Sequence, residues 1–201
     1  MRLSSFFICF LLVGTTLFSC KNDVKNENSE GAETTVDSTV VKNVKETKEE
    51  QKAIANSVLA KLMTTDETRT FTRYMISAGL TDIISKNEGP YTIIAPSNEA
   101  FAKLSKVTLD SLVGQSGNQK LLAVLKGHII EGDFSSSTIL QAVKNGEHTL
   151  PTLGGRSVTF FMEGSDLLVK DASGAVAILG KTDILSENGQ VHVIDAVLGN
   201  F

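Results

Sequence analysis

The composition of the chain changes abruptly near residue 52, and this change limits where a core can form. Residues 21–52 contain no aromatic residue, no Leu, no Ile and no Met, and their sizeable apolar side chains are scattered valines. Such a segment buries too little apolar surface to offset the entropy that ordering removes. We therefore predict an acidic, disordered tether over residues 20–52 and one folded domain over residues 53–201.

The first 19 residues have the pattern of a secretory signal. An apolar run from Phe6 to Phe18 follows Arg2 and ends at Ser19-Cys20. A small residue before the cut suits a signal peptidase, and a Cys directly after it is typical of a bacterial lipoprotein. We therefore predict a lipoprotein signal peptide over residues 1–19 and lipid attachment at Cys20. An uncleaved anchor is the alternative, although the run is short for a membrane span of about 20 residues.

Cysteine content and charge narrow the classes of partner. Cys9 lies within the predicted signal, so Cys20 would be the single cysteine of the mature chain and no intrachain disulfide is predicted. The chain has 19 Lys and Arg residues against 23 Asp and Glu residues, a net charge of −4 without a basic cluster. This balance argues against nucleic-acid binding and against electrostatic attraction to anionic lipid. Membrane association should therefore depend on the N-terminal lipid.

Apolar periodicity indicates helices in the first part of the domain and strands in the last part. Apolar residues recur at helical spacing over 54–62, and Asp66 can cap a second helix. Residues 91–95 read as a buried strand. From Glu147 onward, short strands alternate with turn signals such as Asn188-Gly189; they are expected over 158–162, 167–169, 175–179 and 191–197. Helices followed by strands predict an α+β domain.

Three segments together resemble the signatures of fasciclin-like domains. They are Tyr91–Phe101 (YTIIAPSNEAF), Leu125–Gly132 (LKGHIIEG) and Asn188–Asp195 (NGQVHVID), in the order and spacing of one such domain over residues 54–199. The resemblance implies a compact β-wedge of short strands flanked by helices. It also implies adhesion or extracellular-matrix association, with no general catalytic activity.

The resemblance marks a set of structural or interaction candidates. His128 matches the second member of a Tyr-His pair linked to adhesion, while Gly127 stands in place of the Tyr. Asp183 and Ile184 match a loop that resembles an integrin-contacting motif in animal members, and we interpret this match as mainly structural. The resemblance places Asn98 in a bond to the backbone or to His128. The full set of candidates is Asn98, His128, Phe134, Asp183, Ile184, His192 and Asp195.

The same residues offer little support for catalysis. Ser97, His128 and Asp195 can be imagined as a triad, but no nucleophile elbow or oxyanion segment accompanies them. We interpret Ser97 as a helix cap and His128 and His192 as hydrogen-bonded structural histidines. His192 and Asp195 lie three apart on a strand and so point to opposite faces. No His pair has the i, i+4 spacing of a metal site, and no metal or cofactor is expected.

These observations favour a non-catalytic, lipid-anchored binding module of the bacterial cell envelope, facing the periplasm or the cell exterior. Its ligand would be a protein or a matrix polymer rather than a nucleic acid or a small-molecule substrate. Two alternatives remain. One is a structural envelope lipoprotein that assists assembly of another complex, and the other is a hydrolase with a cryptic site.

Overall fold

The computed structural model describes residue 52 and residues 54–86, 89–114 and 117–199. The predicted signal peptide, the lipid attachment site Cys20 and the predicted tether up to residue 51 lie outside the described residues. Among the described residues, no helix has the length and apolar character needed to cross a membrane.

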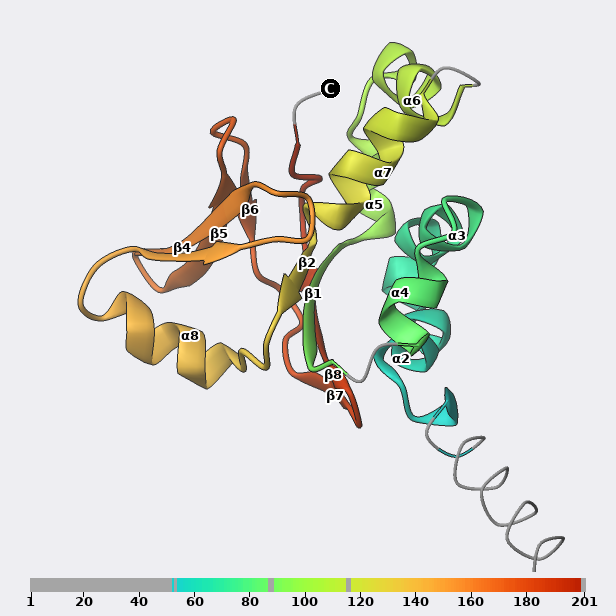
Figure 1. Cartoon of the computed structure of the whole chain (residues 1–201). Helices are drawn as coiled ribbons and strands as arrows, with labels where there is room; N and C mark the ends of the chain where they lie inside the picture. The colour runs from blue at the N-terminus through green and yellow to red at the C-terminus, as the bar shows by residue number, and fades with distance from the viewer. Residues whose placement is uncertain (1–51, 53, 87–88, 115–116, 200–201) are drawn as a thin grey trace, which may run out of the picture. The chain divides into compact units, whose positions relative to one another are not determined.

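Two four-stranded sheets form the centre of the described region (Figure 1). Sheet A has the strand order β2 (Ile129–Glu131), β1 (Tyr91–Pro96), β8 (Gly189–Ile194) and β7 (Ile184–Ser186). Sheet B has the order β3 (His148–Pro151), β4 (Ser157–Glu163), β5 (Asp166–Asp171) and β6 (Val176–Ile178). Strands β1 and β8 pair in parallel and the other neighbours are antiparallel.

Helices occupy most of the chain between and before these strands. They are α2 (Val58–Thr64), the 3-10 helix η1 (Asp66–Thr68), α3 (Arg69–Ser77), α4 (Thr81–Lys86), α5 (Asn98–Ala102), α6 (Lys106–Val113), α7 (Asn118–Lys126) and α8 (Ser136–Val143). Helices and short strands together confirm the predicted α+β class.

Sheet A separates two hydrophobic cores because both of its faces are apolar. On one face, Ile93 and Val191 pack with helical residues such as Phe71 and Leu125. On the other face, residues including Ile94 pack with sheet B and α8. Figure 1 shows the same order, with α2, α3 and α4 on one side of β1 and β8 and sheet B on the other. Burial on both faces explains why β1 is apolar along most of its length, whereas β8 also buries the polar residues Gln190 and His192.

Serine side chains cap the starts of α5 and α8, and one predicted cap is absent. Ser97 caps α5 as predicted, since its Oγ accepts a hydrogen bond from the Ala100 N–H at 3.0 Å. Ser135 caps α8 in the same way through the Thr138 N–H. The prediction for Asp66 was wrong: it begins η1, and its carboxylate bonds Arg69 instead of capping a helix.

Candidate functional site

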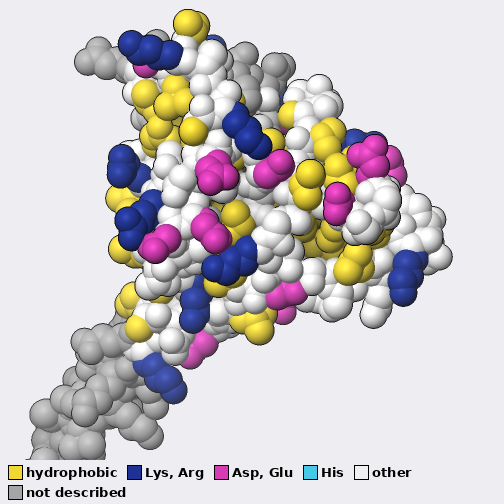
Figure 2. Space-filling model, turned by 180° about the vertical axis from the view of Figure 1, so that it is seen from behind, with side chains coloured by type: hydrophobic (Ala, Val, Ile, Leu, Met, Phe, Trp, Pro, Cys, Tyr) yellow, Lys and Arg dark blue, Asp and Glu magenta, His cyan; other side chains and the backbone are white. Residues whose placement is uncertain are grey.

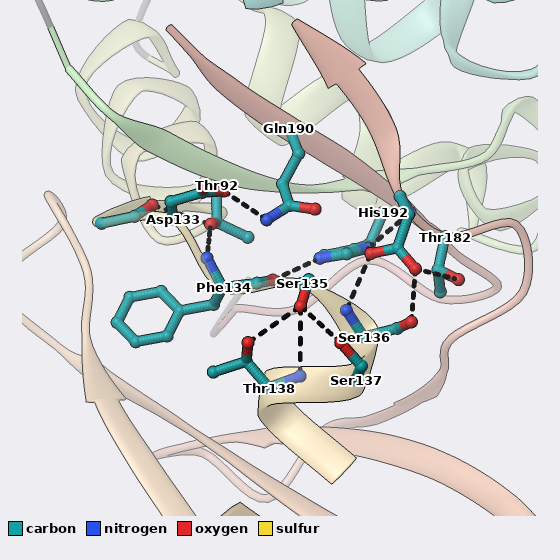
Figure 3. A network of polar contacts seen from close by, with 12 residues as sticks. Thr92, Asp133, Phe134, Ser135, Ser136, Ser137, Thr138, Thr182, Gln190 and His192 are labelled. Atoms are coloured by element: carbon teal, nitrogen blue, oxygen red, sulfur yellow. Dashed lines mark hydrogen bonds and ion pairs between the residues drawn. The ribbon is translucent and has the colours of Figure 1, made fainter. Parts of the chain in front are cut away.

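The loop before β7 and the start of α8 meet through the carboxylate of Asp183. Figure 3 shows the residues around this contact, among them Ser136, Thr182 and His192. The Oδ1 of Asp183 accepts a hydrogen bond from the backbone N–H of Ser136 at 2.8 Å, and its Oδ2 accepts one from the Ser136 hydroxyl. Ser136 is the first residue of α8, where backbone N–H groups lack partners within the helix and favour negative charge. Asp183 therefore holds the helix start against the loop.

The backbone of Asp183 is as specialised as its side chain. Its φ of 57° lies in the left-handed region, which Asp tolerates better than most residues. Burial acts to raise the pKa of the Asp183 carboxyl, but the hydrogen bonds that the carboxylate accepts, chiefly from Ser136, outweigh it and leave the pKa below the ordinary value. The neighbouring Ile184 is half-buried and packs against the helical core. Both residues of the predicted contact motif thus hold positions in the fold.

His192 lies fully buried on β8 and links this loop to the segment before α8. Its Nδ1 accepts the backbone N–H of Asp183 at 3.1 Å, so the ring proton is on Nε2, which donates to the Phe134 carbonyl at 2.8 Å. Burial lowers the pKa of His192, against the opposing effect of the Phe134 bond. The neutral ring therefore joins two backbone segments.

Phe134 is the third predicted candidate in this network. Its N–H donates to the Thr92 hydroxyl at 2.9 Å, and its half-buried ring packs against the core between the sheets. On β8, which pairs with β1, the side-chain amide of Gln190 donates a hydrogen bond to the carboxylate of Asp133. Its Oε1 is the one buried side-chain polar atom of the described region without a hydrogen-bond partner. The Phe134 ring thus contributes to the core, which limits its use as an exposed contact.

His128 lies apart from this network, in the helical core. It is fully buried, and its ring meets Phe71 edge to face at a centroid distance of 5.8 Å. Its Nε2 accepts the Leu198 N–H at 3.1 Å, and its Nδ1 donates to the Val124 carbonyl at 2.8 Å. Burial lowers its pKa to about 4, so the ring is neutral at pH 7.

Asn98 and Asp195 occupy two further positions. Asn98 accepts the Thr70 N–H at 2.9 Å and donates to the Asp66 carbonyl at 2.8 Å, so its partners are backbone groups and not His128. The Asp195 carboxylate accepts the Ile178 N–H at 2.8 Å and lies 3.5 Å from the Lys103 ammonium.

The imagined triad does not assemble. Ser97 bonds Ala100, His128 bonds Val124 and Leu198, and Asp195 bonds Ile178 and Lys103. The structure therefore brings together Phe134, Asp183 and His192 among the predicted residues, and it leaves Asn98, His128 and Asp195 at separate sites.

Sheet B carries an apolar feature that the sequence analysis missed. Phe161, Leu168 and Ile178 are direct cross-strand neighbours on β4, β5 and β6, and Val176 lies on the same face of the sheet. We call these four residues the outer row. Ile178 is 40% and Val176 45% exposed, whereas Phe160, Val169 and Ala177 on the opposite face are fully buried. Runs of consecutive apolar residues, Phe160-Phe161 and Leu167-Leu168-Val169, are the signal that both faces are apolar.

Charged groups border the outer row. The Lys170 ammonium lies 5.1 Å from the centroid of the Phe161 ring and pairs with Glu147. On the face shown in Figure 2, basic and acidic side chains are interspersed and scattered apolar side chains lie between them. An apolar centre with a charged rim is the usual arrangement of a protein interface.

A family profile and individual proteins both match this chain. The profile described as "Fasciclin domain" matches residues 66–200. Protein sll1483 of Synechocystis is 29% identical over 159 residues, which cover 76% of this chain and 82% of that protein. Cell surface glycolipoprotein MPB83 of Mycobacterium bovis is 35% identical over 112 residues, 56% of this chain and 44% of that protein.

A solved structure shares the fold. It is titled as a FAS1 domain pair from the insect cell adhesion molecule fasciclin I, and it aligns with a TM-score of 0.56 at 27% identity. The alignment covers 67% of this chain and 45% of that chain. The chain thus spans less than half of this domain pair and of MPB83.

Proposed function

Because the chain belongs to the fasciclin domain family, we propose that it is a non-catalytic binding module of the cell envelope that adheres to a protein or matrix polymer. A lipid on Cys20 anchors it to the membrane, the residues up to 52 act as a spacer, and the folded domain carries the binding surface. Two similarities support this role: one relative is named a cell surface glycolipoprotein, and the solved structure comes from a cell adhesion molecule.

The outer row is the observation that carries the proposal. Its central Leu168 is buried between Phe161 and Ile178, so the apolar surface in contact with water comes from Val176, Ile178 and the half-buried Phe161. Exposed apolar side chains of this kind, bordered by charged groups, can serve as an interaction site. The residues around Asp183 are less suited to contact because their polar groups already bond one another.

The histidine geometry supports a non-catalytic role. The chain has three histidines, and two of them, His128 and His192, use both ring nitrogens in hydrogen bonds to backbone groups. A general base needs a ring nitrogen within reach of a substrate proton. Neither His128 nor His192 has a free ring nitrogen, because both nitrogens of each ring form hydrogen bonds that stabilise the fold.

The proposal is tested by replacing Ile178 with Lys and measuring capture of envelope and matrix components by the full chain. The charge introduced at Ile178 should weaken capture by about tenfold or more, because it would be buried against the apolar surface of the partner. The matched control is Leu185→Lys, which changes an apolar side chain that is 64% exposed on β7, away from the outer row.

Circular dichroism checks that both variants keep the fold. Equal capture by the wild-type chain and by Ile178→Lys contradicts the assignment of the binding surface. Equal loss in both variants shows that apolar exposure in general, and not the outer row, drives capture.

A further inference from the structure

A cavity of about 190 Å³ lies where the end of α7, the turn between β3 and β4 and the segment after β8 meet. Its apolar walls include Val124 on α7, Val158 on β4 and Leu198 after β8. Leu198 is held by the hydrogen bond from its N–H to His128, which lies fully buried in the adjacent core. The wall is therefore fixed by the fold.

Two glycines form the contact between α7 and the turn. The Gly154 N–H donates to the Lys126 carbonyl at 3.1 Å, and a Cβ at Gly154 would lie 2.9 Å from the Gly127 nitrogen. Gly154 thus allows the turn to pack against the end of the helix. The three atoms nearest to a Cβ at Gly127 would belong to the carbonyl groups of Val124 and Ala123, the closest being the Val124 oxygen at 3.1 Å. Since Gly127 lines the cavity, a larger side chain there would occupy its space.

Two cationic side chains stand at the cavity. Lys120 on α7 and Arg156 at the end of the turn both line it and are exposed. Among the described residues, neither side chain makes a hydrogen bond or an ion pair. One acidic residue, Asp171, also lines the cavity, and its Oδ1 accepts N–H groups of Ser173 and Ala175 at 2.8 and 3.0 Å. The two cationic side chains and the one carboxylate that line the cavity give it a net positive charge.

We infer that this cavity binds a small carboxylate with a compact apolar body. The volume suits such a ligand, because an apolar cavity of roughly 150 Å³ holds one benzene molecule. The apolar body would contact Val124, Val158 and Leu198, and the carboxylate would meet Arg156 and Lys120. Arg is well matched to carboxylates because its guanidinium presents paired donors. The ligand is bound without chemical change, and the site is independent of the outer row.

Benzoate is the probe, and the full chain in detergent, labelled with ¹⁵N, is the protein. Amide resonances of Gly127, Gly154 and Gly199 should shift saturably, with a dissociation constant on the order of 1 mM for so small a ligand. Benzyl alcohol has nearly the same shape without the charge. It should bind about tenfold more weakly, because it lacks the charge-assisted hydrogen bonds.

Three variants distinguish binding of benzoate in the cavity from nonspecific attraction to positive charge on the surface. Arg156→Gln and Lys120→Gln should each weaken benzoate binding several-fold, and Gly127→Leu should abolish it by filling the cavity. Lys126→Gln is the matched control, because Lys126 lies on the same helix and does not line the cavity. Shifts that fail to saturate, or equal affinity in the wild-type chain, Arg156→Gln and Lys120→Gln, would overturn the inference. The two charge variants remain informative if Gly127→Leu does not fold.

Discussion

The backbone N–H of Leu198 donates to Nε2 of His128 at 3.1 Å and joins the segment after β8 to the end of α7. Because Nε2 accepts, the ring proton is on Nδ1, which donates to the Val124 carbonyl at 2.8 Å. The imidazole is fully buried. His128 thus acts in this chain as a neutral bridge between a helix and the last described segment of the chain.

Replacing His128 with Ala should lower the free energy of unfolding by about 1–3 kcal/mol, because two buried backbone groups lose their partner. Urea denaturation followed by circular dichroism measures the change. His148→Ala is the matched control, and it should lower the free energy of unfolding by less than about 0.5 kcal/mol. His148 is half-buried, and its ring centroid lies 6.5 Å from that of Phe134, a distant contact. Equal losses in the two variants would argue against the bridge.

Stability should fall in mild acid, with His128 as a main cause. Burial lowers its pKa from 6.5 to about 4, so between these pH values the unfolded chain binds a proton that the folded chain does not. The His128 contribution is therefore complete above pH 6.5 and is lost as the pH falls toward 4. The size of this loss is about 3 kcal/mol.

Unfolding free energies at several pH values in the wild-type chain and in His128→Ala isolate this effect. The wild-type chain should lose more stability than the variant between pH 6.5 and pH 4. His192 contributes with the same sign in both proteins, because burial lowers its pKa too. Parallel curves would show that His128 does not titrate as described.

Replacing Asp183 with Ala should destabilise the domain by about 1–3 kcal/mol, through loss of the hydrogen bonds to Ser136 at the start of α8. Asp183→Asn should cost less, because Asn keeps an acceptor oxygen and tolerates the left-handed backbone. Thermal unfolding compares both with Asp110→Ala, an exposed acidic residue on α6. Equal melting temperatures of Asp183→Ala and Asp110→Ala would show that Asp183 does not stabilise the start of α8.

Cys20 is expected to carry a diacylglyceryl group after removal of residues 1–19. Mass spectrometry of the native N-terminal peptide should show this adduct, and Cys20→Ala should shift the protein out of the membrane fraction. An unmodified Cys20, or a peptide that retains Met1, would contradict the lipoprotein assignment.

Signals that act over a few residues were readable from the sequence. The Ser97 cap and the strand at β1 each follow from local chemistry. On α3, Phe71 and Met75 are buried, whereas Ile76 is 51% exposed, because five residues beyond Phe71 a helix has turned to a different face.

Contacts between segments far apart in the sequence could not be predicted from local sequence signals. The short strands β3 and β7 were not predicted, because three or four residues carry little periodicity and their order depends on partners far along the chain. The Asp183–Ser136 contact spans 47 residues, so no pattern around either residue reports it. The outer row likewise exists only after β4, β5 and β6 pair in register.

We propose that recognition resides in the folded domain and that the tether is a spacer. Replacing residues 25–45 with a Gly/Ser linker of equal length, and measuring partner capture from envelope extract beside Ile178→Lys, tests it directly. If the domain carries recognition, the linker variant captures as well as the wild-type chain while Ile178→Lys loses capture. Loss of capture on replacing the tether, with normal capture by Ile178→Lys, would place recognition in the tether instead of the domain.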